Sequence, residues 1–191
     1  MTTVPEIVVA IERAFDAAAI PHAFGGALAL GYHVVEPRGT RDVDVNCFVP
    51  ADNPGPVFES LPREIAWTDD DVATVEEVAQ VRVFWRNDIA VDIFFTNHPF
   101  HDIAADNAER VPFENLTIPV LGANELAVFK AFFNRTRDWG DIEAMVDANT
   151  VDLHAVIGWI VDLVGANDER ITRLRSLLNR QPPDEEPRFA S

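Results

Sequence analysis

Two β-rich runs separated by a short polar connection constrain the fold of this chain most strongly. Residues 81–86 and 89–95 are rich in valine, isoleucine and aromatic residues, and they are joined through Asn87 and Asp88. Such residues favour strands, and a two-residue polar connection favours a tight turn. The pattern therefore predicts an antiparallel hairpin. The second run carries a single carboxylate, Asp92, among apolar residues.

A further predicted strand, residues 42–49, carries two more carboxylates on one face. Asp42 and Asp44 are two residues apart, so both project from the face opposite to the valines between and after them. Spaced acids of this kind are also common on solvated strands. However, three converging carboxylates repel one another unless a cation neutralises them, and oxygen ligands suit Mg²⁺. We therefore predict that Asp42, Asp44 and Asp92 form a metal site.

A glycine pair precedes these acids at the start of a predicted helix. Alone, Gly25 and Gly26 would indicate only a tight turn. With the acids downstream, the pair predicts a phosphate site, because the N–H groups at a helix start attract anions. Arg38 and Arg41 lie between the glycines and the strand and would add charged contacts to phosphate, beside the hydroxyl of Thr40.

The remaining pattern places strands in the first two-thirds of the chain and helices in the last third. We expect helices over residues 4–19, 27–34, 57–61, 68–80 and 99–109, the last capped by Asn97, and extended segments over 22–24 and 111–120 with a turn at 114–115. From residue 123 onward the pattern is helical over 123–135, 138–149, 153–165 and 168–179.

These elements predict an α+β fold with a small mixed β-sheet flanked by helices. The expected organisation is a core over residues 1–122, then a C-terminal helical subdomain over 123–180 that completes the site. Residues 181–191 are rich in proline and acids and are expected to form a disordered tail.

The charge and the apolar content of the chain restrict the cellular location and the binding partners that we expect for the protein. No apolar run reaches the roughly 18 residues of a membrane span, and the N-terminus lacks a signal-peptide layout, so a cytoplasmic location without membrane contact is expected. The formal charge is −17, which opposes general nucleic-acid binding. Any such contact must be local, at arginines such as Arg135, Arg137, Arg170, Arg173, Arg175 and Arg180. The single cysteine, Cys47, is expected to be a buried, inert thiol.

Two later segments carry charged residues with two possible roles each. Lys130 is the only lysine, in an otherwise apolar helix, and side chains of this kind commonly extend to solvent. Asp138 starts the next predicted helix and could cap it or belong to the site, with Asp141 one turn later.

In chain order these motifs resemble a known family. The set comprises Gly25-Gly26, Arg38-x-Thr40-x-Asp42-x-Asp44, Val-Asp92-Ile-Phe-Phe, Glu125-Leu126-x-x-x-Lys130 and Arg137-Asp138-x-x-Asp141-Ile142. It spans residues 22–146 and resembles the polymerase-β-like nucleotidyltransferases of the AbiEii/MenT toxin type. The resemblance implies Mg²⁺-dependent transfer of a nucleotide from a nucleoside triphosphate. It assigns catalysis to Asp42, Asp44, Asp92, Lys130 and Asp138, and it places Lys130 on the triphosphate.

The resemblance also implies a target and a partner. The closest subgroup modifies the 3′ end of tRNA, with CTP and UTP as candidate donors here, blocks translation and is countered by a cognate antitoxin protein. Two other functions stay open: transfer to a small molecule or a protein, as in antibiotic-modifying or AMP-transferring relatives, and a catalytically silent nucleotide-binding module. Phosphorylation of Thr40 would place negative charge beside Asp42 and is a plausible means of inactivation.

Overall fold

The computed structural model describes residues 2–86 and 88–180. Their contacts divide the chain into two compact units. The first contains the residues up to 32 together with 37–122 and is called the α/β unit. The second contains residues 33–36 and those from 123 onward and is called the helical unit. The short segment 33–36 thus groups with the late helices, which the sequence pattern did not indicate. Each unit is described by itself.

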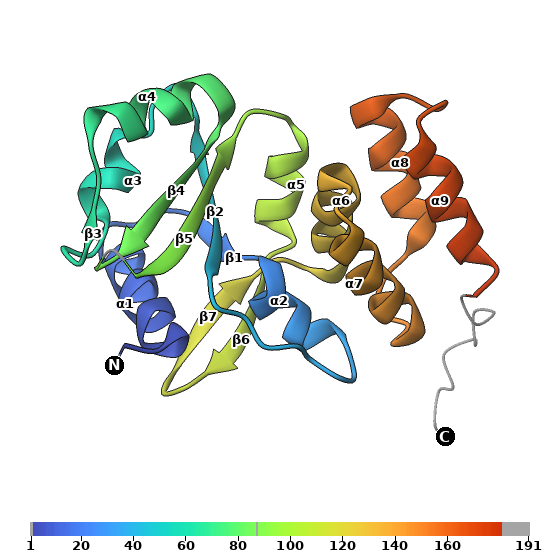
Figure 1. The fold of residues 1–191 in the computed structure, drawn as a ribbon, viewed down its shortest axis with the longest axis horizontal. Helices are drawn as coiled ribbons and strands as arrows, with labels where there is room; N and C mark the ends of the chain where they lie inside the picture. The colour runs from blue at the N-terminus through green and yellow to red at the C-terminus, as the bar shows by residue number, and fades with distance from the viewer. Residues whose placement is uncertain (1, 87, 181–191) are drawn as a thin grey trace. The chain divides into compact units, whose positions relative to one another are not determined.

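A mixed sheet forms the centre of the α/β unit (Figure 1). Within the described residues it has seven strands in the order β3-β4-β5-β2-β1-β7-β6. β2 is parallel to β5 and β1 is parallel to β7, whereas the other neighbours are antiparallel. The strands are β1 (His22–Phe24), β2 (Val43–Pro50), β3 (Ile65–Ala66), β4 (Gln80–Trp85), β5 (Ile89–Thr96), β6 (Glu109–Phe113) and β7 (Leu116–Val120).

The predicted hairpin and the predicted turn at residues 114–115 are both present. β4 and β5 form the expected hairpin, in which Trp85 pairs with Ile89; the predicted turn residue Asn87 lies outside the described residues. β6 and β7 pair around Glu114, whose positive φ of 51° closes the turn. The two-residue β3 was not predicted, because so short a run carries no periodicity.

Five helices within the described residues complete the α/β unit. They are α1 (Val4–Ala17), α2 (Gly26–His33), α3 (Gly55–Ser60), α4 (Asp69–Val78) and α5 (Phe100–Asp106). α1 packs against α3 and β2, α4 against β4, and α5 against β2. The sheet is therefore flanked by helices, as the sequence predicted.

One predicted helix start is wrong. Asn97 does not cap α5; the N-cap is Pro99, and the ring Nδ1 of His98 accepts a hydrogen bond from the N–H of Phe100 at 3.2 Å. The helix also ends at Asp106, because the chain enters β6 at Glu109.

The alternation along β2 separates core from site. Val43, Val45 and Cys47 are buried on one face, and Asp44 is only partly buried on the other. Asp42 lies just before the strand rather than within it. The valine face holds the strand in the core, and this fixes where the acidic face points.

The helical unit contains α6 (Ala123–Phe133), α7 (Thr136–Asp147), α8 (Leu153–Val164) and α9 (Glu169–Leu178). α6 packs against α7 and α8, and α8 packs against α9. All four match predicted helices, and the α+β fold class is confirmed. The predicted disordered tail, 181–191, lies outside the described residues. None of the helices in the described ranges has both the length and the apolar character of a membrane span.

Candidate functional site

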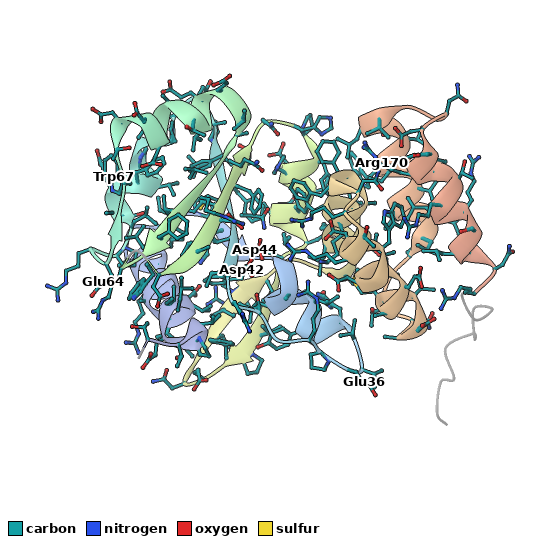
Figure 2. The ribbon with its side chains drawn as sticks, in the orientation of Figure 1. Glu36, Asp42, Asp44, Glu64, Trp67 and Arg170 are labelled. Atoms are coloured by element: carbon teal, nitrogen blue, oxygen red, sulfur yellow. The ribbon has the colours of Figure 1, made fainter. Side chains whose placement is uncertain are left out.

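Two of the predicted metal ligands lie side by side on neighbouring strands. Asp44 on β2 is the register partner of Asp92 on the parallel strand β5. Neighbouring strands are about 4.8 Å apart, and paired residues project from the same face of a sheet. The pairing thus brings together two carboxylates that are 48 positions apart in the sequence. Figure 2 shows Asp42 close to Asp44, at the end of β2 where the chain enters the strand.

A third charged side chain, which sequence reasoning missed, completes this group. Arg82 on β4 is the register partner of Asp92 in the hairpin. Its Nε and Nη2 donate to Oδ1 and Oδ2 of Asp92, both at 2.7 Å. The pKa of Arg82 is raised above its usual value by these hydrogen bonds and by the charge of Asp92, and the charges of Asp42 and Asp44 add to the effect. The charges of all three carboxylates therefore stabilise the protonated guanidinium of Arg82.

Asp42 is held by a local hydrogen bond. The hydroxyl of Thr40 donates to Oδ1 of Asp42 at 2.5 Å. This bond orients the carboxylate in the segment before β2 and makes Thr40 a supporting residue of Asp42. Arg38 and Arg41, the predicted phosphate-binding arginines, are exposed in the same segment.

The glycine pair lies directly against this group. Gly26 starts α2 with a positive φ of 54°, and a Cβ placed there would lie 1.8 Å from Oδ2 of Asp44. The carboxylate of Asp44 thus occupies the space next to the Gly26 backbone, which excludes any side chain at that position. A Cβ on Gly25 would lie 2.8 Å from Nδ2 of Asn46.

The N–H of Gly25 is not available to a phosphate, because it donates to the carbonyl oxygen of Asp44 at 2.9 Å. The N–H groups of the first turn of α2 remain without partners inside the helix, as at any helix start. The start of α2 lies next to Asp44, because Gly26 is in contact with that carboxylate.

The donor set suits a hard cation, although its side chains are engaged within the protein. Asp42, Asp44 and Asp92 offer only oxygen ligands, which Mg²⁺ prefers. Nevertheless, across residues 2–86 and 88–180, no three His, Cys, Asp or Glu side chains are grouped closely enough to hold a metal ion. Thr40 and Arg82 bind Asp42 and Asp92 instead. Asp44 and Asp92 are thus brought together, whereas the three acids do not form a metal-binding group in this structure, and their role as metal ligands stays a prediction.

The helical unit contains the other predicted site residues. Nζ of Lys130 donates to Oδ2 of Asp141 at 2.6 Å and lies 3.9 Å from Oδ1 of Asp138. Lys130 is only 4 % exposed, so the alternative that it extends to solvent is wrong. Its predicted contact with the triphosphate stays a prediction.

Asp138 is not the N-cap of α7, which is Arg135, but lies at the third position of the helix. Its Oδ2 accepts from the backbone N–H and from Nε of Arg135, at 3.2 and 2.7 Å, and so closes a capping box with that residue. The side chain is fully buried. Asp138 thus supports the start of α7, and the catalytic role assigned by the resemblance stays a prediction.

Arginines and aromatic rings pair repeatedly on the helical unit. The guanidinium of Arg135 lies 5.2 Å from the Phe133 ring, that of Arg170 lies 5.9 Å from Phe132, and that of Arg173 lies 4.3 Å from Trp139. Phe132 and Phe133 are exposed, whereas Trp139 is buried beneath Arg173. We call these six residues the arginine–aromatic cluster. Figure 2 labels Arg170 in this unit.

The fold was compared with known proteins. No family model matches the chain, and no curated protein matches its sequence. An antigenic nucleotidyltransferase-like protein from Paracoccidioides brasiliensis is similar in structure, with a TM-score of 0.51 and 14% identity, over 94% of this chain and 88% of that one. ANT(2″)-Ia in complex with adenylyl-2″-tobramycin gives a TM-score of 0.52 and 12% identity, over 94% and 98%.

The chain has a nucleotidyltransferase-like fold. This agrees with the superfamily that the motifs resemble, whereas the AbiEii/MenT subgroup stays a prediction. At such low identities the similarity establishes the fold alone, and the activity has to be argued from the residues.

Proposed function

We propose that this protein is a Mg²⁺-dependent nucleotidyltransferase. The observation that carries the proposal is the pairing of Asp44 with Asp92 beside the start of α2, within a nucleotidyltransferase-like fold. Carboxylates at this place can hold a cation, and the helix start can hold the phosphates that accompany it. No other group of charged residues described above combines the two features.

In the proposed reaction an acceptor hydroxyl attacks the α-phosphorus of a nucleoside triphosphate, and the bond to pyrophosphate breaks. Asp42, Asp44 and Asp92 would hold the magnesium, which supplies charge stabilisation for the entering and leaving oxygens. The first turn of α2 would bind the phosphates, and Arg38 and Arg41 would add charged contacts. Asp92 is also the candidate acceptor of the proton that the attacking hydroxyl loses.

We further propose that the acceptor is the 3′ end of tRNA and that the protein is the toxin of a toxin–antitoxin pair. The motif resemblance is the main support. The exposed rings of Phe132 and Phe133 and the arginines of the cluster add to it, because aromatic faces and guanidinium groups are the side chains on which single-stranded nucleic acid stacks. A cluster of this kind offers a local contact despite the charge of −17.

A small-molecule acceptor is the second candidate. The charge of −17 favours it, because a polyanion is repelled by the chain as a whole and a small cationic acceptor is attracted. ANT(2″)-Ia, whose fold is similar, was solved with an adenylylated tobramycin.

Acceptor competition separates these functions. The protein is incubated with Mg²⁺ and each of the four α-labelled nucleoside triphosphates, together with total tRNA or with a set of aminoglycosides. We expect label on tRNA, and loss of that label in Asp42→Asn but not in Asp52→Asn, an exposed aspartate just after β2. Label on aminoglycosides alone would favour the second candidate. Absence of transfer to either class, in RNA and in small-molecule fractions of a cell extract, would contradict the proposed activity.

A further inference from the structure

Arg82 donates hydrogen bonds to both carboxylate oxygens of Asp92. A guanidinium that donates from Nε and Nη2 forms a two-pronged pair, which is the most directional ion pair that a carboxylate makes in proteins. The two bonds of 2.7 Å use one lone pair on each oxygen of Asp92. A cation on the remaining lone pairs of Asp92 would lie beside the positive guanidinium, so Arg82 and the cation oppose each other through charge repulsion.

The surrounding charges explain why an arginine is located here. Asp44 is the neighbour of Asp92 across the strand pair, and the charges of Asp42 and Asp44 also act on Arg82. Without a positive charge at this place, the carboxylates would repel one another across one strand spacing. Arg82 therefore supplies the neutralisation that the sequence argument assigned to a metal.

The pair is accessible enough to exchange. The side chain of Arg82 is 56 % exposed and that of Asp92 is 16 % exposed. Because water reaches the guanidinium, its charge can be solvated when the pair opens, although the two-pronged geometry makes this pair stronger than a typical exposed one. A buried pair could not open in this way.

We propose that Arg82 is an internal counter-ion that holds Asp92 beside Asp44 and is displaced from it when a divalent cation binds. The inference rests on the proposed metal-dependent function. It makes Arg82 a positioning residue: the guanidinium keeps the acids together without metal, and its departure is part of every metal-binding event. Metal affinity is therefore set partly by Arg82 and not by the acids alone.

The test measures Mn²⁺ binding to the full chain by calorimetry, without nucleotide. The wild type is compared with Arg82→Gln, Arg82→Lys and, as a matched control, Arg86→Gln. Arg86 follows Arg82 in the hairpin and lies 3.5 Å from Glu64, so its removal deletes the same charge outside the acidic group. Thermal unfolding of each variant with and without Mn²⁺ is recorded in parallel.

We expect Arg82→Gln to bind Mn²⁺ about two- to fivefold more tightly than Arg86→Gln, the range that one exposed ion pair spans. Arg82→Lys should be intermediate, because a lysine keeps the charge and loses the two-pronged geometry. Without metal, Arg82→Gln should also unfold at a lower temperature than the wild type. Addition of Mn²⁺ should raise its unfolding temperature by more than that of the wild type. If Arg82 served only to hold the fold together, Arg82→Gln would bind Mn²⁺ more weakly than Arg86→Gln.

The inference would be overturned if Arg82→Gln bound Mn²⁺ no more tightly than Arg86→Gln. If the wild type still transferred nucleotides with Mg²⁺, the proposed function would remain intact. A wild type that neither binds Mn²⁺ nor transfers nucleotides would overturn the proposed function, and the inference with it.

Discussion

Each of the two units pairs a basic side chain with predicted site acids, Arg82 in the α/β unit and Lys130 in the helical unit, yet the two pairs differ in exposure. In the α/β unit, the side chain of Arg82, which pairs with Asp92, is 56 % exposed. In the helical unit, the side chains of Lys130 and Asp141 are only 5 % and 8 % exposed. Water screens the first pair and can replace either partner, whereas the second would leave a charge buried if it opened. The exposed pair is suited to exchange its cation, and the buried pair is suited to fix a structure.

The surplus of acidic residues is also unequal between the two regions. Residues 1–122 contain twenty acidic and seven basic residues, whereas residues 123–180 contain nine and seven. A divalent cation is thus attracted to the first region, and a nucleic acid is least repelled by the second. Substitutions in each region should separate these roles.

The largest effect is expected for Lys130→Met. Removal of the lysine leaves Asp141 buried without its cation, and we expect the free energy of unfolding to fall by about 3 to 5 kcal/mol. Denaturant unfolding measures this change. The double variant Lys130→Met, Asp141→Leu should recover most of it, because the stranded charge is also removed. Unchanged stability with lost transfer would instead place Lys130 in the chemistry, as the resemblance predicts.

The next effect is expected for Gly26→Ala, which tests the close contact in the α/β unit. The added methyl group would overlap Asp44, and an alanine is strained at a φ of 54°. We expect a loss of about 1 to 3 kcal/mol in denaturant unfolding. Gly31→Ala, in the same helix, is the control: its Cβ would lie 3.7 Å from that of Pro37, an ordinary contact. Equal stability of the two variants would contradict the contact.

A smaller effect is expected for Arg173→Ala in the arginine–aromatic cluster. Loss of one guanidinium should reduce labelling of tRNA about three- to tenfold, with a shallower salt dependence, because a phosphate or base contact is lost. Arg63→Ala, a 93 % exposed arginine of the α/β unit, controls for the change in charge. If both variants label tRNA equally well, the cluster does not contact the RNA.

The smallest effect is expected at Cys47. Burial raises the pKa of this thiol far above its ordinary value. Since the thiolate is the reactive form, iodoacetamide should not modify the native protein at pH 8 and should modify it fully once unfolded. Mass spectrometry before and after denaturation checks this. Rapid modification of the native protein would show that β2 is not packed as described.

Part of the site could be predicted because it depends on strand periodicity. The two-residue repeat placed Asp44 on the side opposite the valines, although Asp42, predicted to share that strand, lies just before it, and the hairpin was evident from composition. Arg82 was missed, although the hairpin register that pairs Trp85 with Ile89 also pairs Arg82 with Asp92. Counting outward from the turn would have found it.

Other contacts could not be read from the sequence, because they depend on packing between elements. The parallel pairing of β2 with β5 decides that Asp44 lies beside Asp92, and no local pattern specifies it. The packing of α6 against α7 likewise gives Lys130 its partner Asp141. The contact of Gly26 with Asp44 requires the exact position of α2 relative to β2, which only the assembled fold provides.

The most direct test of the central claim is the release of pyrophosphate by chelator-treated protein on addition of Mg²⁺, a nucleoside triphosphate and total tRNA. We expect Mg²⁺-dependent release by the wild type and by Asp52→Asn. Asp44→Asn should be slower by about a hundredfold or more, the effect of removing one charge-stabilising group from an active site. Release by Asp44→Asn at the rate of the wild type would contradict the assignment of the β2 and β5 carboxylates as the active site.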